Sequence, residues 1–220
     1  FRGVQEQDNV ERPPLVAIKK LNKAVVDRYL AEGGKENPYR EICRYQDLGD
    51  NKHVIRCEAL EDSEHLYIIT IKGKSFDTVV FSPTQTHDDA TIHAWVVQML
   101  RILQYLEKHN IHHRDLSPDN LLILPNEELV LADFAMSLRI PRVARSDDDG
   151  QTQRTLMNCE DVFGTPAWMA PEILFKRDFD GVLSDLWCVM HITYNLMVKK
   201  LLFHVPFWGD FSYRFFVLAG

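Results

Sequence analysis

The chain has 220 residues, enough for one large domain or two small ones with a hydrophobic core. Its hydrophobic content of 45% and charged content of 26% are typical of a globular protein. A formal net charge of −7 argues against nucleic acid as a partner. Four cysteines without C-x-x-C spacing predict neither a disulfide framework nor a zinc site, and they favour a reducing, cytoplasmic location.

Neither a signal peptide nor a membrane span is expected. The first residues lack the charged and apolar regions of a signal peptide. The most apolar long segment, residues 182–198, contains Asp185, His191 and Asn195. Because it is short for a span and these side chains are costly to place in lipid, we interpret it as a buried helix.

The first half of the chain is expected to contain strands followed by an amphipathic helix. The apolar run 15–20 ends in lysines, as in a strand whose end reaches a polar site. Residues 54–57 and 66–70 read as two more strands around a turn at 61–64. A helix before them can begin only after Gly33-Gly34 or Asn37-Pro38, since proline is tolerated at a first helical position. Residues 91–108 have apolar side chains at three- and four-residue spacing, which predicts a helix.

Residues 113–135 carry the side chains that are best suited to one reactive centre. Two short apolar runs, 121–124 and 129–131, flank a Pro-Asn turn and predict a hairpin. Such a hairpin places Asn120 before its first strand and Asp133 after its second, at the same edge. Two oxygen ligands there can hold Mg²⁺, which needs few protein ligands besides phosphates and water. Asp115 is expected beside them as a proton acceptor.

These residues belong to a pattern that resembles the eukaryotic protein kinases. Residues 113–120 read HRDLSPDN against the family pattern H-R-D-L-x-x-x-N, and residues 133–135 read DFA against D-F-G. Residues 16–19 read VAIK, as in the third kinase strand. Residues 164–172 read GTPAWMAPE, close to the G-T-x-x-[YW]-x-A-P-E of serine/threonine kinases.

The resemblance implies an α+β, bilobal protein-kinase-like fold. A small, mainly antiparallel β N-lobe with one helix and an incomplete glycine-rich loop is expected over residues 1–70. Residues 71–77 would form the hinge and connector. A larger, mainly helical C-lobe without the distal helices of the family would occupy residues 78–220. The function implied is transfer of the ATP γ-phosphate to serine or threonine hydroxyls of proteins, with a pseudokinase binding module as the alternative.

The resemblance also implies the residue roles. Asp115 would accept the substrate proton, while Lys19 would hold the α- and β-phosphates of ATP. Asn120 and Asp133 would bind Mg²⁺. Glu41 is preferred over Glu32 and Glu36 as the partner of Lys19. The positions expected around adenine are Val4, Ala17, Thr70 as gatekeeper, Ile71, Lys72 and Leu122.

Three further contacts are implied around the catalytic loop. Thr165 would hydrogen-bond Asp115, and a buried Asp185 would hold the backbone of the loop. Asp161 stands at the usual phosphosite of the activation loop, and we expect it to pair with Arg114 and partly replace phosphorylation. An upstream activating kinase is expected as a partner, besides ATP and a protein substrate.

Three departures from the family pattern leave the pseudokinase open. The glycine-rich loop would end at Val4, and two of its glycines have no counterpart. Ser117 replaces a lysine near the transferred phosphate. Ala135 replaces the metal-loop glycine, where a methyl group disfavours a positive φ.

Overall fold

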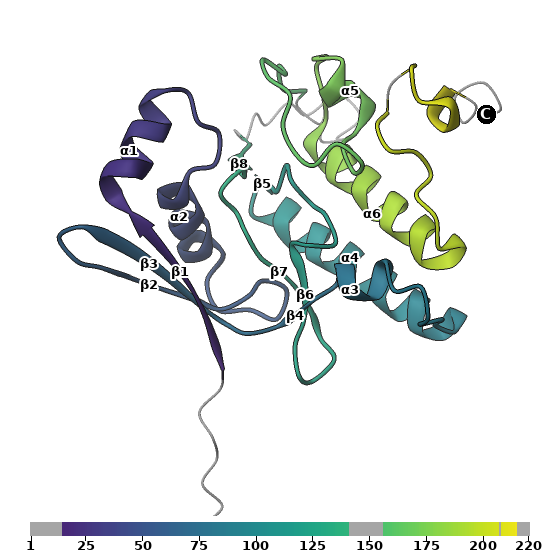
Figure 1. Ribbon diagram of the computed structural model, residues 1–220, viewed down its shortest axis with the longest axis horizontal. Helices are drawn as coiled ribbons and strands as arrows, with labels where there is room; N and C mark the ends of the chain where they lie inside the picture. The colour runs from purple at the N-terminus through teal and green to yellow at the C-terminus, as the bar shows by residue number, and fades with distance from the viewer. Residues whose placement is uncertain (1–14, 141–155, 207, 215–220) are drawn as a thin grey trace, which may run out of the picture.

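The computed structural model describes residues 15–140, 156–206 and 208–214. Figure 1 shows two parts. One is a sheet accompanied by two helices, and the other is mainly helical. This arrangement confirms the bilobal α+β fold. The expected end of the glycine-rich loop, including Val4, lies outside the described residues. The elements of the first lobe are β1 (Val16–Asn22), α1 (Lys23–Ala31), α2 (Pro38–Leu48), β2 (Cys57–Glu61) and β3 (His65–Ile71).

The sheet of the first lobe is antiparallel and has the order β1-β3-β2. In its register Lys19 lies opposite Ile68, and Thr70 lies between Ala17 on one side and Cys57 on the other. The first residues of β1 thus lie beside the end of β3 that leads into the second lobe. This pairing brings the VAIK segment next to the expected hinge.

Helix α2 begins where the sequence allows it. Asn37 caps the helix by accepting a hydrogen bond from the backbone N–H of Arg40, and Pro38 is the first helical residue. The structure adds α1, which the sequence did not predict. Asn22 caps α1, but Val26 is the one buried residue of this helix, and Val25 is exposed. A helix with so little apolar face leaves no periodic signal.

The expected strand at 54–57 is displaced, because β2 begins only at Cys57. The side-chain oxygen of Asn51 accepts hydrogen bonds from the backbone N–H groups of His53 and Val54. This turn directs Val54 and Ile55 into the core of the second lobe, where Val54 forms a parallel bridge with Leu131. Both residues are apolar because they are buried, not because they belong to the sheet.

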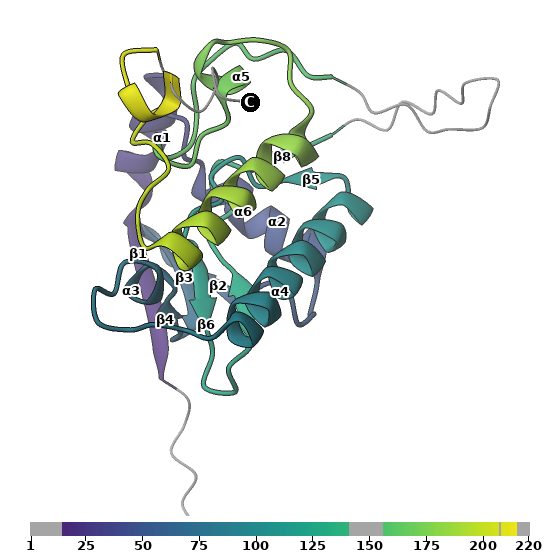
Figure 2. The ribbon, with the colours of Figure 1, turned by 90° about the vertical axis from the view of Figure 1, so that its right-hand side faces the viewer.

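Two long helices form the centre of the second lobe. Helices α4 (Asp89–Lys108) and α6 (Gly181–Val198) pack side by side, as Figures 1 and 2 show. The core between them contains the apolar face of α4, including Met99, Ile102 and Leu106. The remaining elements are short: β4 (Lys74–Ser75), α3 (Asp77–Val80), β5 (Ile111–His112), β6 (Leu121–Ile123), β7 (Leu129–Leu131), β8 (Leu138–Arg139) and α5 (Pro171–Leu174).

The predicted hairpin is confirmed as β6 and β7. The two strands are antiparallel, with Leu122 opposite Val130, and β4 pairs with the other edge of β6. All three residues of β7 are buried. The hairpin therefore sits on the core with its open end at the catalytic loop. Among the described helices, none is both long and apolar enough to cross a membrane.

Candidate active site

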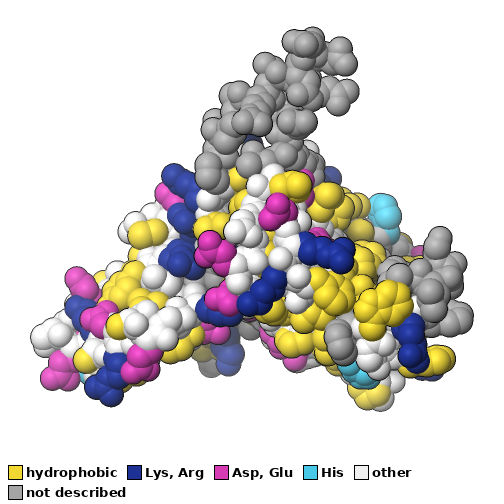
Figure 3. Space-filling model, turned by 90° about the horizontal axis from the view of Figure 1, so that it is seen from above, with side chains coloured by type: hydrophobic (Ala, Val, Ile, Leu, Met, Phe, Trp, Pro, Cys, Tyr) yellow, Lys and Arg dark blue, Asp and Glu magenta, His cyan; other side chains and the backbone are white. Residues whose placement is uncertain are grey.

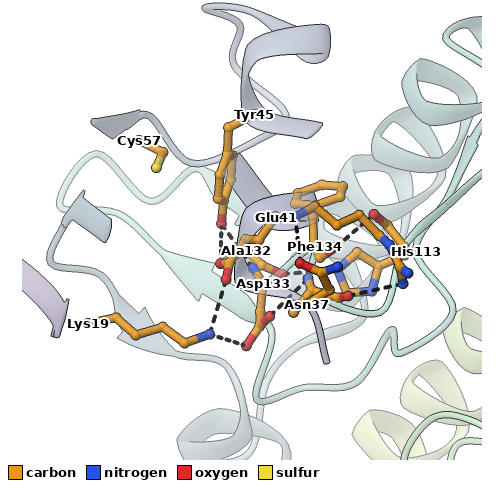
Figure 4. A network of polar contacts seen from close by, with 12 residues as sticks. Lys19, Asn37, Glu41, Tyr45, Cys57, His113, Ala132, Asp133 and Phe134 are labelled. Atoms are coloured by element: carbon orange, nitrogen blue, oxygen red, sulfur yellow. Dashed lines mark hydrogen bonds and ion pairs between the residues drawn. The ribbon is translucent and has the colours of Figure 1, made fainter. Parts of the chain in front are cut away.

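Lys19, Glu41 and Asp133 meet between the two lobes, although they come from three distant segments. Lys19 Nζ lies 3.0 Å from Glu41 Oε2 and 3.7 Å from Asp133 Oδ2 (Figure 4). The Glu41 side chain is 4% exposed, whereas those of Lys19 and Asp133 are 40% and 44% exposed. The ion pair expected between Lys19 and Glu41 is therefore formed, with its lysine end open to a ligand.

The electrostatics of this group favour a charged lysine. Burial opposes the charge on Lys19, but the carboxylates of Glu41 and Asp133 outweigh burial and raise its pKa. The pKa of Glu41 is also raised, first by burial and then by the Asp133 carboxylate, while Lys19 works in the opposite direction. Lys19 and the hydrogen bond from Tyr45 thus favour the charged form of Glu41, which burial and Asp133 oppose.

Tyr45 links α2 to the loop at residues 133–135, the expected metal-binding loop, through a contact that was not predicted. The Tyr45 hydroxyl accepts a hydrogen bond from the backbone N–H of Asp133 at 3.0 Å and donates one to Glu41 Oε1 at 3.4 Å (Figure 4). Its ring packs edge-on against Phe134, with 5.3 Å between ring centroids. The available signal was its position four residues after Glu41, on the same helix face.

The loop at 133–135 has a strained backbone, but not where the substituted glycine suggested. Asp133 has a φ of 61°, whereas Ala135 is not among the residues with positive φ. The methyl group of Ala135 is therefore accommodated. The carbonyl oxygen of Ala135 accepts hydrogen bonds from the Asn37 backbone N–H at 3.1 Å and from Arg40 Nη1 at 3.4 Å. The N-terminus of α2 thus binds the end of this loop.

Asp185 holds the backbone of the catalytic loop, as expected. It is buried at the start of α6, and its two carboxylate oxygens accept hydrogen bonds from the backbone N–H groups of His113 (2.9 Å) and Arg114 (3.1 Å). Arg114 has a φ of 69°, so a sterically unfavourable turn is fixed by a charge-assisted hydrogen bond. This turn precedes Asp115, whose side chain contacts Asn120 and Thr165.

Asp115 is fixed by the segment that precedes α5. The backbone N–H and the Oγ1 hydroxyl of Thr165 both donate to Asp115 Oδ1, each at 2.9 Å. The preceding Gly164 has a φ of 88°, and a Cβ at this position would lie 2.8 Å from the carbonyl oxygen of Arg114. Only glycine allows both this backbone conformation and this close approach. The expected contact between Thr165 and Asp115 is confirmed.

Asn120 lies between Asp115 and the metal-binding loop. Its amide Nδ2 donates to the Asp115 carbonyl at 2.8 Å and approaches Asp115 Oδ2 at 3.4 Å. The backbone carbonyl oxygen of Asn120 accepts a hydrogen bond from the backbone N–H of Ala132, next to Asp133. Because the amide nitrogen is engaged, the Oδ1 atom is left for a cation. An amide oxygen and a carboxylate are hard donors that suit Mg²⁺.

Of the residues expected around adenine, Ala17, Thr70 and Ile71 lie on the adjoining strands β1 and β3, and Leu122 lies on β6. Ala17 and Thr70 are paired across β1 and β3, followed along β3 by Ile71. The backbone N–H of Lys72 donates to the carbonyl of Leu15. A Cβ on Gly73 would lie 2.8 Å from the Cβ of Leu122. The hinge therefore passes directly over β6, which brings Leu122 close to the end of the first-lobe sheet.

Asp161 does not pair with Arg114, contrary to expectation. Its carboxylate lies 3.8 Å from Lys35 Nζ and 3.6 Å from Lys176 Nζ. The Arg114 guanidinium instead stacks on the Phe163 ring at 3.7 Å. The Asp161 carboxylate is thus shared between two lysines from other segments, and Arg114 is held by an aromatic ring instead. Figure 3, a view from above, shows basic and acidic side chains mixed across the middle of the molecule.

A cavity of about 330 Å³ lies beside the catalytic loop, and its wall includes Lys35, Arg40, Arg114 and Asp161.

Ser117, which stands where the family pattern has a lysine, is buried in the catalytic loop. Its hydroxyl has no hydrogen-bond partner in the part of the chain that the structure describes. Because serine is uncharged, Ser117 does not supply the positive charge that a lysine would supply at this position.

An ion pair between Lys19 and the buried Glu41, an Asp-Asn-Asp constellation and this two-lobed fold together define a protein kinase domain. The sequence pattern of the family described as "Protein kinase domain" matches residues 3–207. The chain therefore belongs to this family.

Curated relatives are plant kinases of greater length. CBL-interacting protein kinase 14 of Oryza sativa subsp. japonica is 30% identical over 210 residues, which cover 94% of this chain and 44% of that protein. CBL-interacting serine/threonine-protein kinase 26 of Arabidopsis thaliana is 30% identical over 207 residues, covering 92% of this chain and 44% of that protein. The chain thus spans less than half the length of these relatives.

Proposed function

We propose that the chain transfers the γ-phosphate of ATP to serine or threonine hydroxyls of a protein substrate. The observation that carries this proposal is the meeting of Lys19 with Glu41 and Asp133, because it combines a phosphate-binding cation with a metal-binding carboxylate. The division into an N-lobe at 1–70, a hinge at 71–77 and a C-lobe at 78–220 belongs to the same proposal.

The proposal assigns a role to each residue of the site. Asp115, fixed at one oxygen by Thr165, orients the substrate hydroxyl and accepts its proton at Oδ2. Lys19 binds the α- and β-phosphates. Asn120 and Asp133 hold Mg²⁺. Bound Mg-ATP supplies the phosphoryl group and the neutralising charge, so the protein contributes chiefly position and electrostatics. Val4, Ala17, Thr70, Ile71, Lys72 and Leu122 enclose adenine.

The test is transfer of radiolabelled phosphate from Mg-ATP to a generic protein substrate. The matched control is Asp115→Asn, which retains an oxygen to accept the hydrogen bonds of Thr165 but cannot take up the proton. We expect labelling that the control loses almost entirely. If labelling does not exceed the control while nucleotide binding is intact, the chain is a nucleotide-binding module instead.

We further propose that an upstream kinase controls this activity and that the protein acts in the cytoplasm. The cavity lined by Lys35, Arg40 and Arg114 supports such control, because three cations near one carboxylate can accept a phosphate group. Treatment of the purified protein with a phosphatase is expected to lower its activity. Unchanged activity after complete dephosphorylation would contradict it.

A further inference from the structure

The Tyr45 hydroxyl closes a ring of contacts that begins and ends at Asp133. The Asp133 backbone N–H donates to Tyr45, and Tyr45 donates to Glu41 Oε1. Lys19 Nζ donates a hydrogen bond to Glu41 Oε2 and lies 3.7 Å from Asp133 Oδ2. Both the backbone and the carboxylate of Asp133 are thus held, from two directions, by one helix and one strand (Figure 4).

The hydroxyl has the chemistry that this ring needs. A phenol has one proton to donate and lone pairs with which to accept. Burial and the neighbouring Glu41 raise the pKa of Tyr45 far above its ordinary value, so the proton stays on its oxygen. The proton is directed to the carboxylate of Glu41, and the lone pair is used by the amide of Asp133. The hydroxyl therefore meets one acceptor, the Glu41 carboxylate, and one donor, the Asp133 amide.

Asp133 is the residue of the loop that requires such support. Its φ of 61° is unfavourable for a residue with a side chain, and such a conformation persists only where its surroundings fix it. The backbone N–H bond to Tyr45 acts on this residue directly. The Asn37 and Arg40 bonds reach only Ala135, two residues later.

We propose that Tyr45 is a positioning residue, whose hydroxyl couples α2 to the metal-binding loop and so sets the Asp133 carboxylate for Mg²⁺. This inference rests on the proposed function, since Asp133 is the metal ligand of that site. Tyr45 touches neither substrate nor metal. It acts through Asp133 on one side and through Glu41 and Lys19 on the other.

A simpler role for Tyr45 is that of a core residue. Its ring is buried against Phe134, and the ring alone accounts for this packing. Tyr45→Phe separates the two roles, because it keeps the ring and removes only the hydroxyl. The matched control is Tyr39→Phe on the same helix, where the exposed hydroxyl lies 3.1 Å from Asp27 Oδ1, away from the site.

The decisive measurement is phosphate transfer as a function of Mg²⁺ concentration at saturating ATP. We expect Tyr45→Phe to raise the half-saturating Mg²⁺ concentration about three- to tenfold, the effect of one lost hydrogen bond, while Tyr39→Phe leaves it unchanged. Loss of folded protein would lower the rate equally at every Mg²⁺ concentration without moving the midpoint. An unmoved midpoint in Tyr45→Phe overturns the proposal.

Hydrogen exchange at the Asp133 amide supplies a readout that needs no catalysis. We expect the Asp133, Phe134 and Ala135 amides to exchange faster in Tyr45→Phe than in Tyr39→Phe, because the loop opens more often once the hydroxyl is gone. Equal exchange in both variants overturns the coupling. If the unchanged protein transfers no phosphate, the proposed function fails, while exchange still decides whether Tyr45 holds the loop.

Discussion

Thr165 donates two hydrogen bonds to the same oxygen of Asp115, one from its backbone and one from its hydroxyl, both 2.9 Å long. Only the second can be removed by substitution. The other Asp115 oxygen, Oδ2, lies 3.4 Å from Asn120 Nδ2. The segment that precedes α5 therefore controls the orientation of the residue to which we assign proton transfer.

Thr165→Val is expected to lower kcat by about tenfold or more, while the KM for ATP changes little. Valine keeps the β-branched shape but removes one hydrogen bond to a charged group, which contributes about 1.5–3 kcal/mol. Thr165→Ser restores the hydroxyl and most of the rate. Steady-state kinetics of the three proteins check this. Equal rates for the valine and serine variants would show that the hydroxyl is not needed.

Gly181→Ala is expected to destabilise the protein, although alanine generally favours a helix more than glycine does. A Cβ at Gly181 would overlap the buried His112 ring, which precedes the catalytic loop. Overpacking of this kind costs about 1–3 kcal/mol. Urea unfolding measures the change. In a double-mutant cycle, His112→Ala should remove most of the penalty, and a penalty that persists there would implicate something other than the overlap.

Binding of Mg-ATP is expected to weaken on acidification at a pH above the ordinary carboxyl range. Burial and Asp133 raise the pKa of Glu41, so it takes up a proton at a higher pH than a typical glutamate, whose pKa is about 4.3. Protonated Glu41 no longer forms an ion pair with Lys19. Calorimetric titration across pH measures this loss. Glu41→Gln should bind weakly at neutral pH and lack this acidic transition; its retention would point to another group.

Asp185→Asn is expected to lower both stability and activity. Asparagine offers one carbonyl oxygen where the carboxylate accepts hydrogen bonds from two backbone N–H groups, those of His113 and Arg114. An unsatisfied buried N–H costs about 1–3 kcal/mol. Thermal unfolding and kinetics check both effects.

The matched control for that variant is Asp210→Asn. Asp210 also accepts backbone N–H bonds, from His204, Ser212 and Tyr213, but at the surface of the second lobe. Its substitution should leave activity unchanged. If both variants lose activity alike, the role of Asp185 in the catalytic loop is wrong.

The local patterns predicted the elements whose residues carry a strong periodic or capping signal. The hairpin of β6 and β7 and helix α4 were predicted because apolar spacing decides them locally. The start of α2 at Pro38 was one of the two starts that glycine and proline allowed. Helix α1 was missed because only Val26 is buried. The strand at 54–57 was displaced because burial of Val54 and Ile55 in the second lobe resembles a strand pattern.

Short motifs of specific spacing were enough to select Lys19, Asp115, Asn120 and Asp133 as the candidate reactive residues. The partners of the surrounding residues could be identified only after the chain had folded. Asp161 binds Lys35 and Lys176 rather than Arg114, and Tyr45 binds Asp133 from a distance of 88 residues along the chain. The physical reason is that motifs record local geometry, whereas these contacts depend on how α2 docks against the metal-binding loop.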